Sequence, residues 1–195
     1  MKQEFSNREK HILKMAISLM VKDGFEEVTI TKLSNWTKLD ETFIRKTFPS
    51  DLKLKMSAME YAAFLWVNKI RSHAESINDP NEKLCYVVKE FAFGTEEYGQ
   101  SLSLYIDIWA KIRKYNQSVD TAWLKKSLLE IYNYYVSFFN ELYFNEGNSR
   151  DDNSLAWLMV VLSDGIHIQS LLDNMEINRE IIVNQLCCLI KCNEK

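Results

Sequence analysis

Hydrophobic residues recur every three or four positions along most of the chain, which is the spacing that places them on one face of an α-helix. A first helix is predicted over residues 7–23 from the spacing of Leu13, Ala16, Ile17 and Met20. No stretch of useful length alternates with the two-residue period of a β-strand. The pattern therefore predicts an all-α fold of about nine helices.

Residues that break helices mark the limits of the later ones. A long helix is expected from residue 51 to about residue 77, where the polar cluster 78–81 ends it. Pro80 suits the first turn of the next helix, which should run to about Phe93. A short irregular stretch is expected over residues 94–99. Four further helices are expected around these apolar residues: Tyr98, Leu102, Tyr105, Trp109 and Ile112; Leu124, Leu128, Ile131, Tyr135, Phe138 and Leu142; Leu155, Leu158, Leu162, Ile166 and Leu171; Ile182, Leu186, Leu189 and Ile190.

The region from Ile12 to Phe48 has the layout of a helix-turn-helix. Gly24 can cap the end of the first helix, and Thr29 can cap the start of a second that runs to about Trp36. A third helix is expected over residues 41–47, with Asp40 as its cap and Pro49 as its stop; Leu33, Ile44 and Phe48 are expected to face inward. A short helix with basic residues on its exposed side fits the major groove of DNA.

Charge supports this assignment modestly. The 195 residues carry a net charge of −3, yet residues 1–57 hold 11 Lys and Arg against 8 Asp and Glu, and the remainder is acidic. A mildly basic head on an acidic body suits DNA contact at one end. No apolar stretch is long enough to span a membrane, and the first residues lack the apolar core of a signal peptide, so a cytoplasmic location is expected.

Other chemistries have little support. Cys85, Cys187, Cys188 and Cys192 form no CxxC motif, so neither a disulfide framework nor a zinc site is predicted, although a soft-metal or thiol-sensor role stays open. The simpler interpretation is that these cysteines are small buried hydrophobes. The three histidines are widely separated, and no HExxH, GxSxG or phosphate-loop motif occurs. We therefore expect neither an enzyme nor a cofactor or metal.

The first 55 or so residues resemble the DNA-binding domain of the TetR/AcrR family of bacterial transcriptional regulators. The matching residues, which keep the family spacing without gaps, are Ile12-Leu13, Ala16, Leu19, Gly24-Phe25, Thr29, Leu33, Leu39, Ile44 and Phe48-Pro49-Ser50. The resemblance implies a helix-turn-helix head over residues 1–50 and a ligand-binding and dimerisation bundle over residues 51–195. Residues 51–78 would form the linking helix.

The chain departs from the family pattern at several positions of the head. Lys38 replaces the usual turn glycine, and Thr42 stands where glycine or proline is common. Asp40 and Glu41 place acidic side chains at the start of the third helix, where DNA phosphates normally dock in the family. Asp51 stands where a lysine is common. These acids favour an alternative function, namely a TetR-like helical small-molecule-binding protein with weak or lost DNA recognition.

If residues 41–47 enter the major groove, Arg45 is the best candidate for direct readout, because its planar fork matches guanine O6 and N7. Thr47 is a further candidate DNA contact on the outward side of this helix. Arg45 and Thr47 replace tyrosines that the family has near the end of the helix. Glu41 can accept from cytosine N4, and Thr42 and Phe43 can meet a thymine methyl group. The phosphate contacts are expected from Thr31, Lys32, Lys38, Lys46 and Lys53.

The resemblance also implies a small-molecule effector in the C-terminal bundle and a homodimer through the last two helices. The candidate ligand-binding residues are Phe91, Tyr105, Trp109, Tyr132, Tyr135, Phe138 and His167. Carboxylates on the same segments, Glu90, Asp107, Glu130 and Glu141, could select a lipophilic cation among small hydrophobic effectors. Gly165 interrupts a strongly helical segment, and close approach of a partner helix would explain it. The pairing segments would be 155–174 and 177–192.

Overall fold

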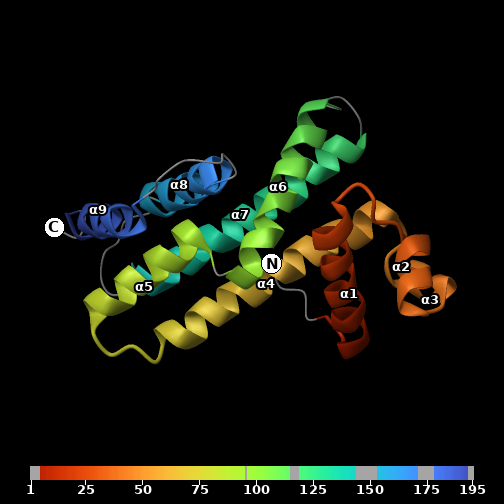
Figure 1. The fold of residues 1–195 in the computed structure, drawn as a ribbon, viewed down its shortest axis with the longest axis horizontal. Helices are drawn as coiled ribbons and strands as arrows, with labels where there is room; N and C mark the ends of the chain where they lie inside the picture. The colour runs from red at the N-terminus through yellow and green to blue at the C-terminus, as the bar shows by residue number, and fades with distance from the viewer. Residues whose placement is uncertain (1–4, 95, 115–118, 144–152, 171–177, 193–195) are drawn as a thin grey trace. The chain divides into compact units, whose positions relative to one another are not determined.

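The computed structural model of the chain describes residues 5–94, 96–114, 119–143, 153–170 and 178–192. These ranges hold nine helices and no strand, which confirms the all-α prediction (Figure 1). The helices are α1 (Asn7–Asp23), α2 (Ile30–Thr37), α3 (Glu41–Thr47), α4 (Asp51–Ala74), α5 (Pro80–Phe93), α6 (Glu96–Lys114), α7 (Val119–Tyr143), α8 (Ser154–Ser170) and α9 (Arg179–Cys192). In the described ranges, none of them combines the length and apolar character that a membrane span requires.

Two boundaries differ from those expected. The stretch 94–99 is not irregular throughout, because α6 begins at Glu96 and contains Gly99. A single glycine inside a helix costs only about 1 kcal/mol, which a helix of 19 residues tolerates. Helix α4 ends at Ala74, and the next residues turn more tightly, with the Ser76 and Ile77 N–H groups bonding three residues back. The residues Gly147-Asn148-Ser149 predict a further loop, which lies outside the described residues.

Side-chain caps set the starts of the first three helices. The Ser6 hydroxyl and the Glu9 side chain form a reciprocal capping box at α1. Thr29 accepts from the Lys32 N–H at 3.1 Å to cap α2, and Asp40 accepts from the Thr42 N–H at 2.8 Å to cap α3. Each cap satisfies a backbone donor that has no partner within its helix. The predicted caps Thr29 and Asp40 are therefore confirmed.

The inward residues of the head are those that the hydrophobic spacing selects. Leu33 of α2 and Ile44 of α3 have no exposed surface, and Phe48 after α3 is 3% exposed. Helix α2 packs on both α1 and α3. Burial of such side chains contributes about 1.5–3 kcal/mol each, so this small core holds α3 in place.

Asp51 joins the first turn of α4 to the start of α2. Its Oδ1 accepts a hydrogen bond from the Ile30 N–H at 2.8 Å in a half-buried setting. That N–H belongs to the first turn of α2 and has no acceptor within the helix. Asp51, which stands where the family commonly has lysine, therefore has a structural role within the head.

Replacing Asp51 by alanine is expected to lower the free energy of unfolding by about 1–3 kcal/mol, because the half-buried Ile30 N–H loses its acceptor. Asp51→Asn keeps an oxygen at that position and removes only the charge, so it should cost less than half as much. Urea unfolding of the two variants beside the wild type measures both values. Equal losses in the two variants would mean that charge, and not the hydrogen bond, is what matters.

The described chain divides into two compact units. Unit 1 comprises Met1–Leu65 and Gln100–Ile131, and unit 2 comprises Trp66–Gly99 and Tyr132–Lys195. Within unit 2, α5 packs on α8 and α9.

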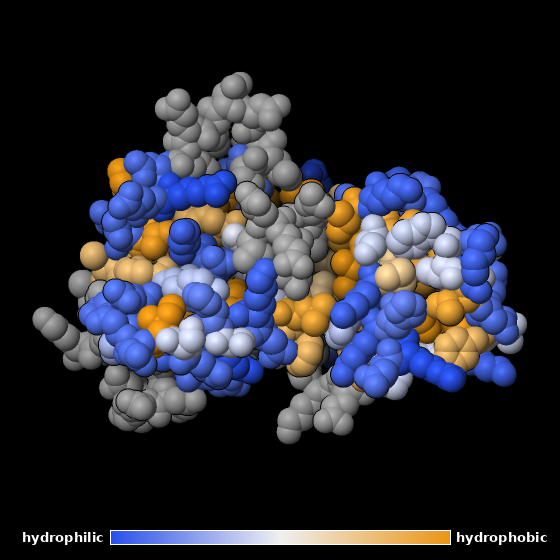
Figure 2. Space-filling view, turned by 60° about the horizontal axis from the view of Figure 1, so that its bottom comes forward, coloured by the Kyte–Doolittle hydropathy of each residue, from blue (hydrophilic) through white to orange (hydrophobic). Residues whose placement is uncertain are grey.

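The space-filling view shows hydrophobic residues at several places on the face that it presents, set among hydrophilic ones (Figure 2). The described large apolar side chains that are exposed are Trp36, Phe64, Leu129, Leu158, Val161, Ile168, Ile181 and Leu189.

Candidate functional site

The helix-turn-helix of unit 1 presents α3 with its polar side chains outward. Thr42, Arg45 and Lys46 are exposed, while Phe43 and Thr47 are half-buried. Ile44 between them is fully buried, so α3 is held by its inner face and has its outer face available. This is the arrangement that a recognition helix requires.

Three of the predicted DNA-contacting residues lie together. The Oε1 atom of Glu41 accepts from Arg45 Nε at 2.8 Å and from Thr31 Oγ1 at 3.0 Å. A second guanidinium nitrogen of Arg45 lies 2.7 Å from the same oxygen. The hydrogen bonds from Arg45 and Thr31 hold the pKa of Glu41 below its usual value. The candidate base reader is thus already paired in the free protein.

The lysines predicted to contact phosphate fall into two groups. Lys32 pairs with Asp23 at 3.1 Å, and the Lys53 ammonium lies 5.2 Å from the centre of the Trp123 ring. Lys38 and Lys46 are exposed, and among the described residues neither forms an ion pair. These two lysines are therefore the most accessible cations of the predicted set.

Lys38 occupies the left-handed conformation that the family reserves for glycine, with φ 61° and ψ 18°. It is the one residue besides glycine, in the described ranges, with a positive φ. This conformation costs an L-residue about 1–2 kcal/mol.

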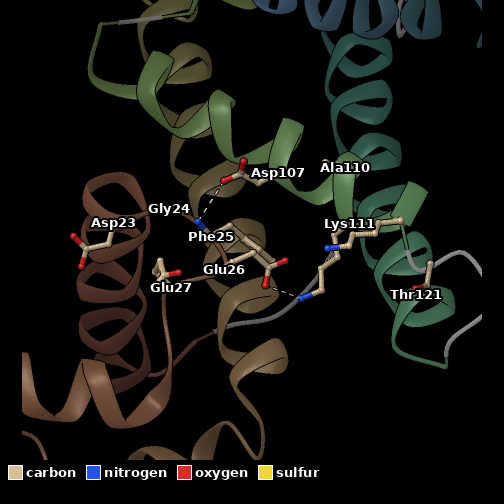
Figure 3. A pocket seen from close by; sticks show the side chains of 10 residues that line it. Asp23, Gly24, Phe25, Glu26, Glu27, Asp107, Ala110, Lys111 and Thr121 are labelled. Carbon is tan, nitrogen blue, oxygen red and sulfur yellow. Dashed lines mark hydrogen bonds and ion pairs between the residues drawn. The ribbon is translucent and has the colours of Figure 1, made fainter.

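A pocket of about 770 Å³ lies in unit 1 beside the turn between α1 and α2 (Figure 3). Residues from the end of α1, from that turn, from α6 and from the start of α7 line it, and most of these residues carry a charge. Figure 3 shows Asp107 pointing to the backbone N–H of Phe25, a contact of 3.4 Å, and Glu26 pointing to a lysine. None of the seven predicted ligand-binding residues is part of this lining.

The charged groups behind this pocket form a network around Phe25. Glu26 Oε2 lies 2.9 Å from Lys111 Nζ and 3.9 Å from Lys55 Nζ. The Lys55 ammonium also sits 4.7 Å from the centre of the Phe25 ring. Burial lowers the pKa of Lys55, and Glu26 acts in the opposite direction. The network ties the α1–α2 turn to α4 and to α6 within unit 1.

The predicted ligand-binding residues divide between the two units. Tyr105 and Trp109 belong to unit 1, where Tyr105 is buried and Trp109 is half-buried. The other five, in unit 2, are Phe91, Tyr132, Tyr135, Phe138 and His167. The assignment of all seven to an effector site stays a prediction.

An aromatic cluster centres on Phe91 in unit 2. The Phe91 ring lies 4.8 Å from Trp66, 5.4 Å from Tyr135 and 4.4 Å from Phe139, measured between ring centroids. Phe138 adjoins Phe139 at 5.9 Å. The contacts of Phe91 with Tyr135 and Phe139 are edge-on, and such contacts are favourable beyond the area that they bury. The cluster packs as a core does, with Phe91 only 1% exposed.

Of the other two predicted ligand-binding residues of unit 2, His167 belongs to α8 and Tyr132 of α7 contacts a side chain of α8. The Tyr132 ring faces Trp157 with 6.4 Å between centroids. Ser163 donates to the Phe91 carbonyl oxygen at 2.6 Å, and its oxygen lies 3.3 Å from His167 Nδ1. Burial lowers the pKa of His167, which favours a neutral ring at pH 7.

Asp164 is a residue that the sequence reasoning missed. Burial raises the pKa of Asp164 to about 6, and the nearby Tyr132 hydroxyl acts in the opposite direction. The available signal was its isolation, because it is the one acidic residue within α8, whose residues are mostly apolar. The four carboxylates that the sequence suggested for selecting a cation lie in different settings. Burial raises the pKa of Glu90. Asp107 lies at the pocket of unit 1, and Glu141 pairs with Arg71 at 2.6 Å. Glu130 is exposed.

Helices α8 and α9 each carry apolar side chains on their exposed surface. Leu158, Val161 and Ile168 are 43%, 61% and 42% exposed, and with Gly165 they follow steps of three and four residues, which places them on one face of α8. A Cβ atom added at Gly165 would meet no atom within 4 Å.

Of the described cysteines, Cys187 is buried, Cys85 is half-buried and Cys188 is exposed. The buried-hydrophobe interpretation therefore holds for Cys187 and not for Cys188.

Solved structures resemble this chain along nearly its whole length. A protein from Rhodococcus sp., described as a TetR-family transcriptional regulator, matches with a TM-score of 0.70 and 16% identity over 96% of this chain and 98% of that one. A transcriptional regulator from Saccharomonospora viridis in complex with choline matches with a TM-score of 0.65 and 19% identity over 97% and 98% of the two chains.

The multidrug binding protein EbrR in complex with proflavin matches with a TM-score of 0.61 and 16% identity over 94% and 99%. No protein-family model and no curated protein sequence matches this chain significantly. At these identities the likeness concerns the fold. The chain accordingly has the fold of the TetR/AcrR family of transcriptional regulators.

Proposed function

We propose that this protein is a ligand-responsive DNA-binding transcriptional regulator rather than an enzyme. It acts in the cytoplasm as a homodimeric repressor that a small hydrophobic molecule releases from its operator. The observation that carries the proposal is the outer face of α3, where Arg45 and Lys46 are exposed on a helix anchored by the buried Ile44. Residues 1–50 would bind DNA, and residues 51–195 would bind the effector and the second copy.

The alternative function, a small-molecule-binding protein that has lost DNA recognition, rested on Asp40, Glu41 and Asp51. Each of these acids has an intramolecular hydrogen-bonding role. Asp40 caps α3, Asp51 accepts from the Ile30 N–H, and Glu41 accepts from Arg45. The acids therefore have structural explanations that do not require a loss of DNA binding, which supports the first function.

A mobility-shift assay with DNA from the region upstream of the protein's own gene tests the proposal. We expect a shift that survives excess random DNA and weakens as salt rises, because bound Lys and Arg displace counterions from phosphates. Arg45→Ala should weaken binding by about 1–3 kcal/mol and relax selectivity at one base pair. A protein that shifts no DNA even at low salt would support the alternative function.

We propose α8 and α9 as the dimer interface. The exposed apolar face formed by Leu158, Val161 and Ile168 supports it, as does the open space beside Gly165 where a partner helix could approach closely. Part of the expected pairing segments, residues 171–177, lies outside the described residues. Sedimentation at micromolar concentration should give a dimer, whereas a monomer would contradict both this interface and two-headed operator binding.

We propose that the effector site lies in unit 2 and accepts a lipophilic cation. Asp164 supports this, since it places a half-buried carboxylate near the Tyr132 side chain, and the Tyr132 ring in turn contacts Trp157. A carboxylate combined with aromatic faces favours organic cations. The complexes of structurally similar proteins with choline and with proflavin are in keeping with such a ligand.

Affinity for a quaternary ammonium ion is expected to rise by about tenfold between pH 5 and pH 7, because only ionised Asp164 attracts the cation and its pKa is about 6. Fluorescence titration with a quaternary ammonium dye at both pH values measures the change.

Asp164→Asn should remove most of this pH dependence, while the matched variant Glu141→Gln should keep it. The folded state itself favours protonated Asp164, so its contribution to stability is present below about pH 4 and is lost as pH rises through about 6. Unfolding curves at each pH separate this effect from binding. An affinity that is independent of pH in the wild type would contradict an effector contact with Asp164.

A further inference from the structure

The outer side of the helix-turn-helix contains a preformed pair of opposite charges. Oε1 of Glu41 accepts hydrogen bonds from Arg45 Nε at 2.8 Å and from Thr31 Oγ1 at 3.0 Å. A second guanidinium nitrogen of Arg45 lies 2.7 Å from the same oxygen. That second nitrogen, Nη2, also lies 3.5 Å from Thr31 Oγ1. Because Thr31 belongs to α2, the carboxylate is fixed by both helices, and it in turn fixes the guanidinium.

This pairing leaves a defined set of hydrogen-bonding groups unused. A guanidinium has five N–H donors and a carboxylate has two acceptor oxygens. Among the described residues, Nη1 of Arg45 and Oε2 of Glu41 take part in no hydrogen bond. Both side chains are partly exposed, at 47% for Arg45 and 36% for Glu41. The pair therefore offers donors and an acceptor side by side to whatever meets the outer face of α3.

In the major groove, a G·C base pair presents two acceptors on guanine, O6 and N7, beside one donor on cytosine, the N4 amino group. The free edge of Arg45 complements the guanine acceptors, and the free oxygen of Glu41 complements the cytosine amino group. An A·T pair presents a different order of groups, including a thymine methyl group with which a carboxylate cannot form a hydrogen bond. The pair has no net charge, so it adds little attraction for phosphate.

We propose that Glu41 and Arg45 act as one unit that reads a G·C base pair, with Arg45 contacting the guanine and Glu41 the amino group of its cytosine. Glu41 determines specificity and also positions Arg45, and Thr31 holds Glu41 in place. The inference rests on the proposed DNA binding by α3. It assigns a positive role to an acid that, taken alone, would oppose phosphate. Removal of the carboxylate should consequently harm selectivity more than affinity.

The test begins with the full-length wild-type protein and a pool of random-sequence DNA duplexes, from which bound duplexes are enriched and sequenced. We expect one strongly preferred G·C position in each half-site. The same selection with Glu41→Gln should lose that preference, and its affinity for the wild-type duplex relative to random duplex should fall about tenfold. Affinity for random duplex should stay equal or rise, because a negative charge has been removed.

A double-mutant cycle tests whether the two residues act together. If they form one unit, Glu41→Gln combined with Arg45→Ala should be no worse in selectivity than Arg45→Ala alone. Lys46→Gln is the matched control, since it changes a neighbouring exposed charge on α3; it should weaken binding to selected and random duplexes alike and reduce the salt slope by about one. Thermal unfolding of each variant verifies that the fold is retained.

The outcomes separate this inference from the proposed function. If the wild type enriches no sequence, the proposed function and this inference are both wrong. If the wild type enriches a sequence and Glu41→Gln enriches the same one with equal selectivity, only the reading unit is wrong. Additive effects of the two substitutions would likewise show that Glu41 and Arg45 read independently.

Discussion

Replacing Phe91 by alanine is expected to lower the free energy of unfolding by about 3–5 kcal/mol, the range for removing a buried aromatic side chain. Phe91 contacts Trp66, Tyr135 and Phe139, and only 1% of its surface is exposed. Because it contacts aromatic side chains from α4 and α7, the cavity left behind cannot collapse without moving helices. Chemical denaturation followed by circular dichroism measures the loss.

The matched control is Phe64→Ala, since Phe64 is 40% exposed and stacks on Tyr61 at 6.3 Å. This variant should lose less than about 1 kcal/mol. The comparison also addresses function. A loss below about 1 kcal/mol at Phe91 would mean that its surroundings relax easily, as at a ligand cavity, and would contradict its assignment to a packed core.

Replacing Ile44 by alanine should lower the free energy of unfolding by about 2–5 kcal/mol and abolish the selective DNA binding that we propose. Ile44 is fully buried and is the only buried residue of the seven-residue α3. So short a helix is not stable by itself in water, and its position depends on this anchor. Calorimetry and mobility shift on the same preparation measure the two effects together.

The control for that experiment is Ile44→Val, which shortens the side chain by one methylene and should cost about 0.5–1.5 kcal/mol with binding retained. Thr42→Ala on the exposed side should leave stability within about 0.5 kcal/mol of wild type. Selective binding by a folded Ile44→Ala protein would contradict the claim that this residue holds the recognition helix in place.

The sequence predicts the head well because its signals are local. Thr29 and Asp40 act on backbone groups two or three residues away, and Leu33 and Ile44 follow helical spacing, so no long-range information is required. Gly99 shows the limit of such signals, since α6 passes through it. A glycine predicts a break only where the rest of the segment is a weak helix former.

Contacts between distant segments could not be predicted in this way. The Asp51 contact with Ile30, the contact of Lys55 with Phe25 and the position of Asp164 beside Tyr132 all depend on how helices pack. Spacing within one helix gives the face of a residue but not the residue opposite it. For the same reason the aromatic residues of the body could be predicted as buried, yet not sorted into core and effector site.

The hydrogen bond from the Ile30 N–H to Asp51 has a mechanical consequence. It joins the first turn of α4 to the first turn of α2 by a bond of 2.8 Å, so a displacement of α4 has either to break this bond or to carry the start of α2 with it. Because α3 packs on α2, a rotation of α4 that keeps the bond would change the orientation of both short helices, and the proposed DNA-binding face would turn with them.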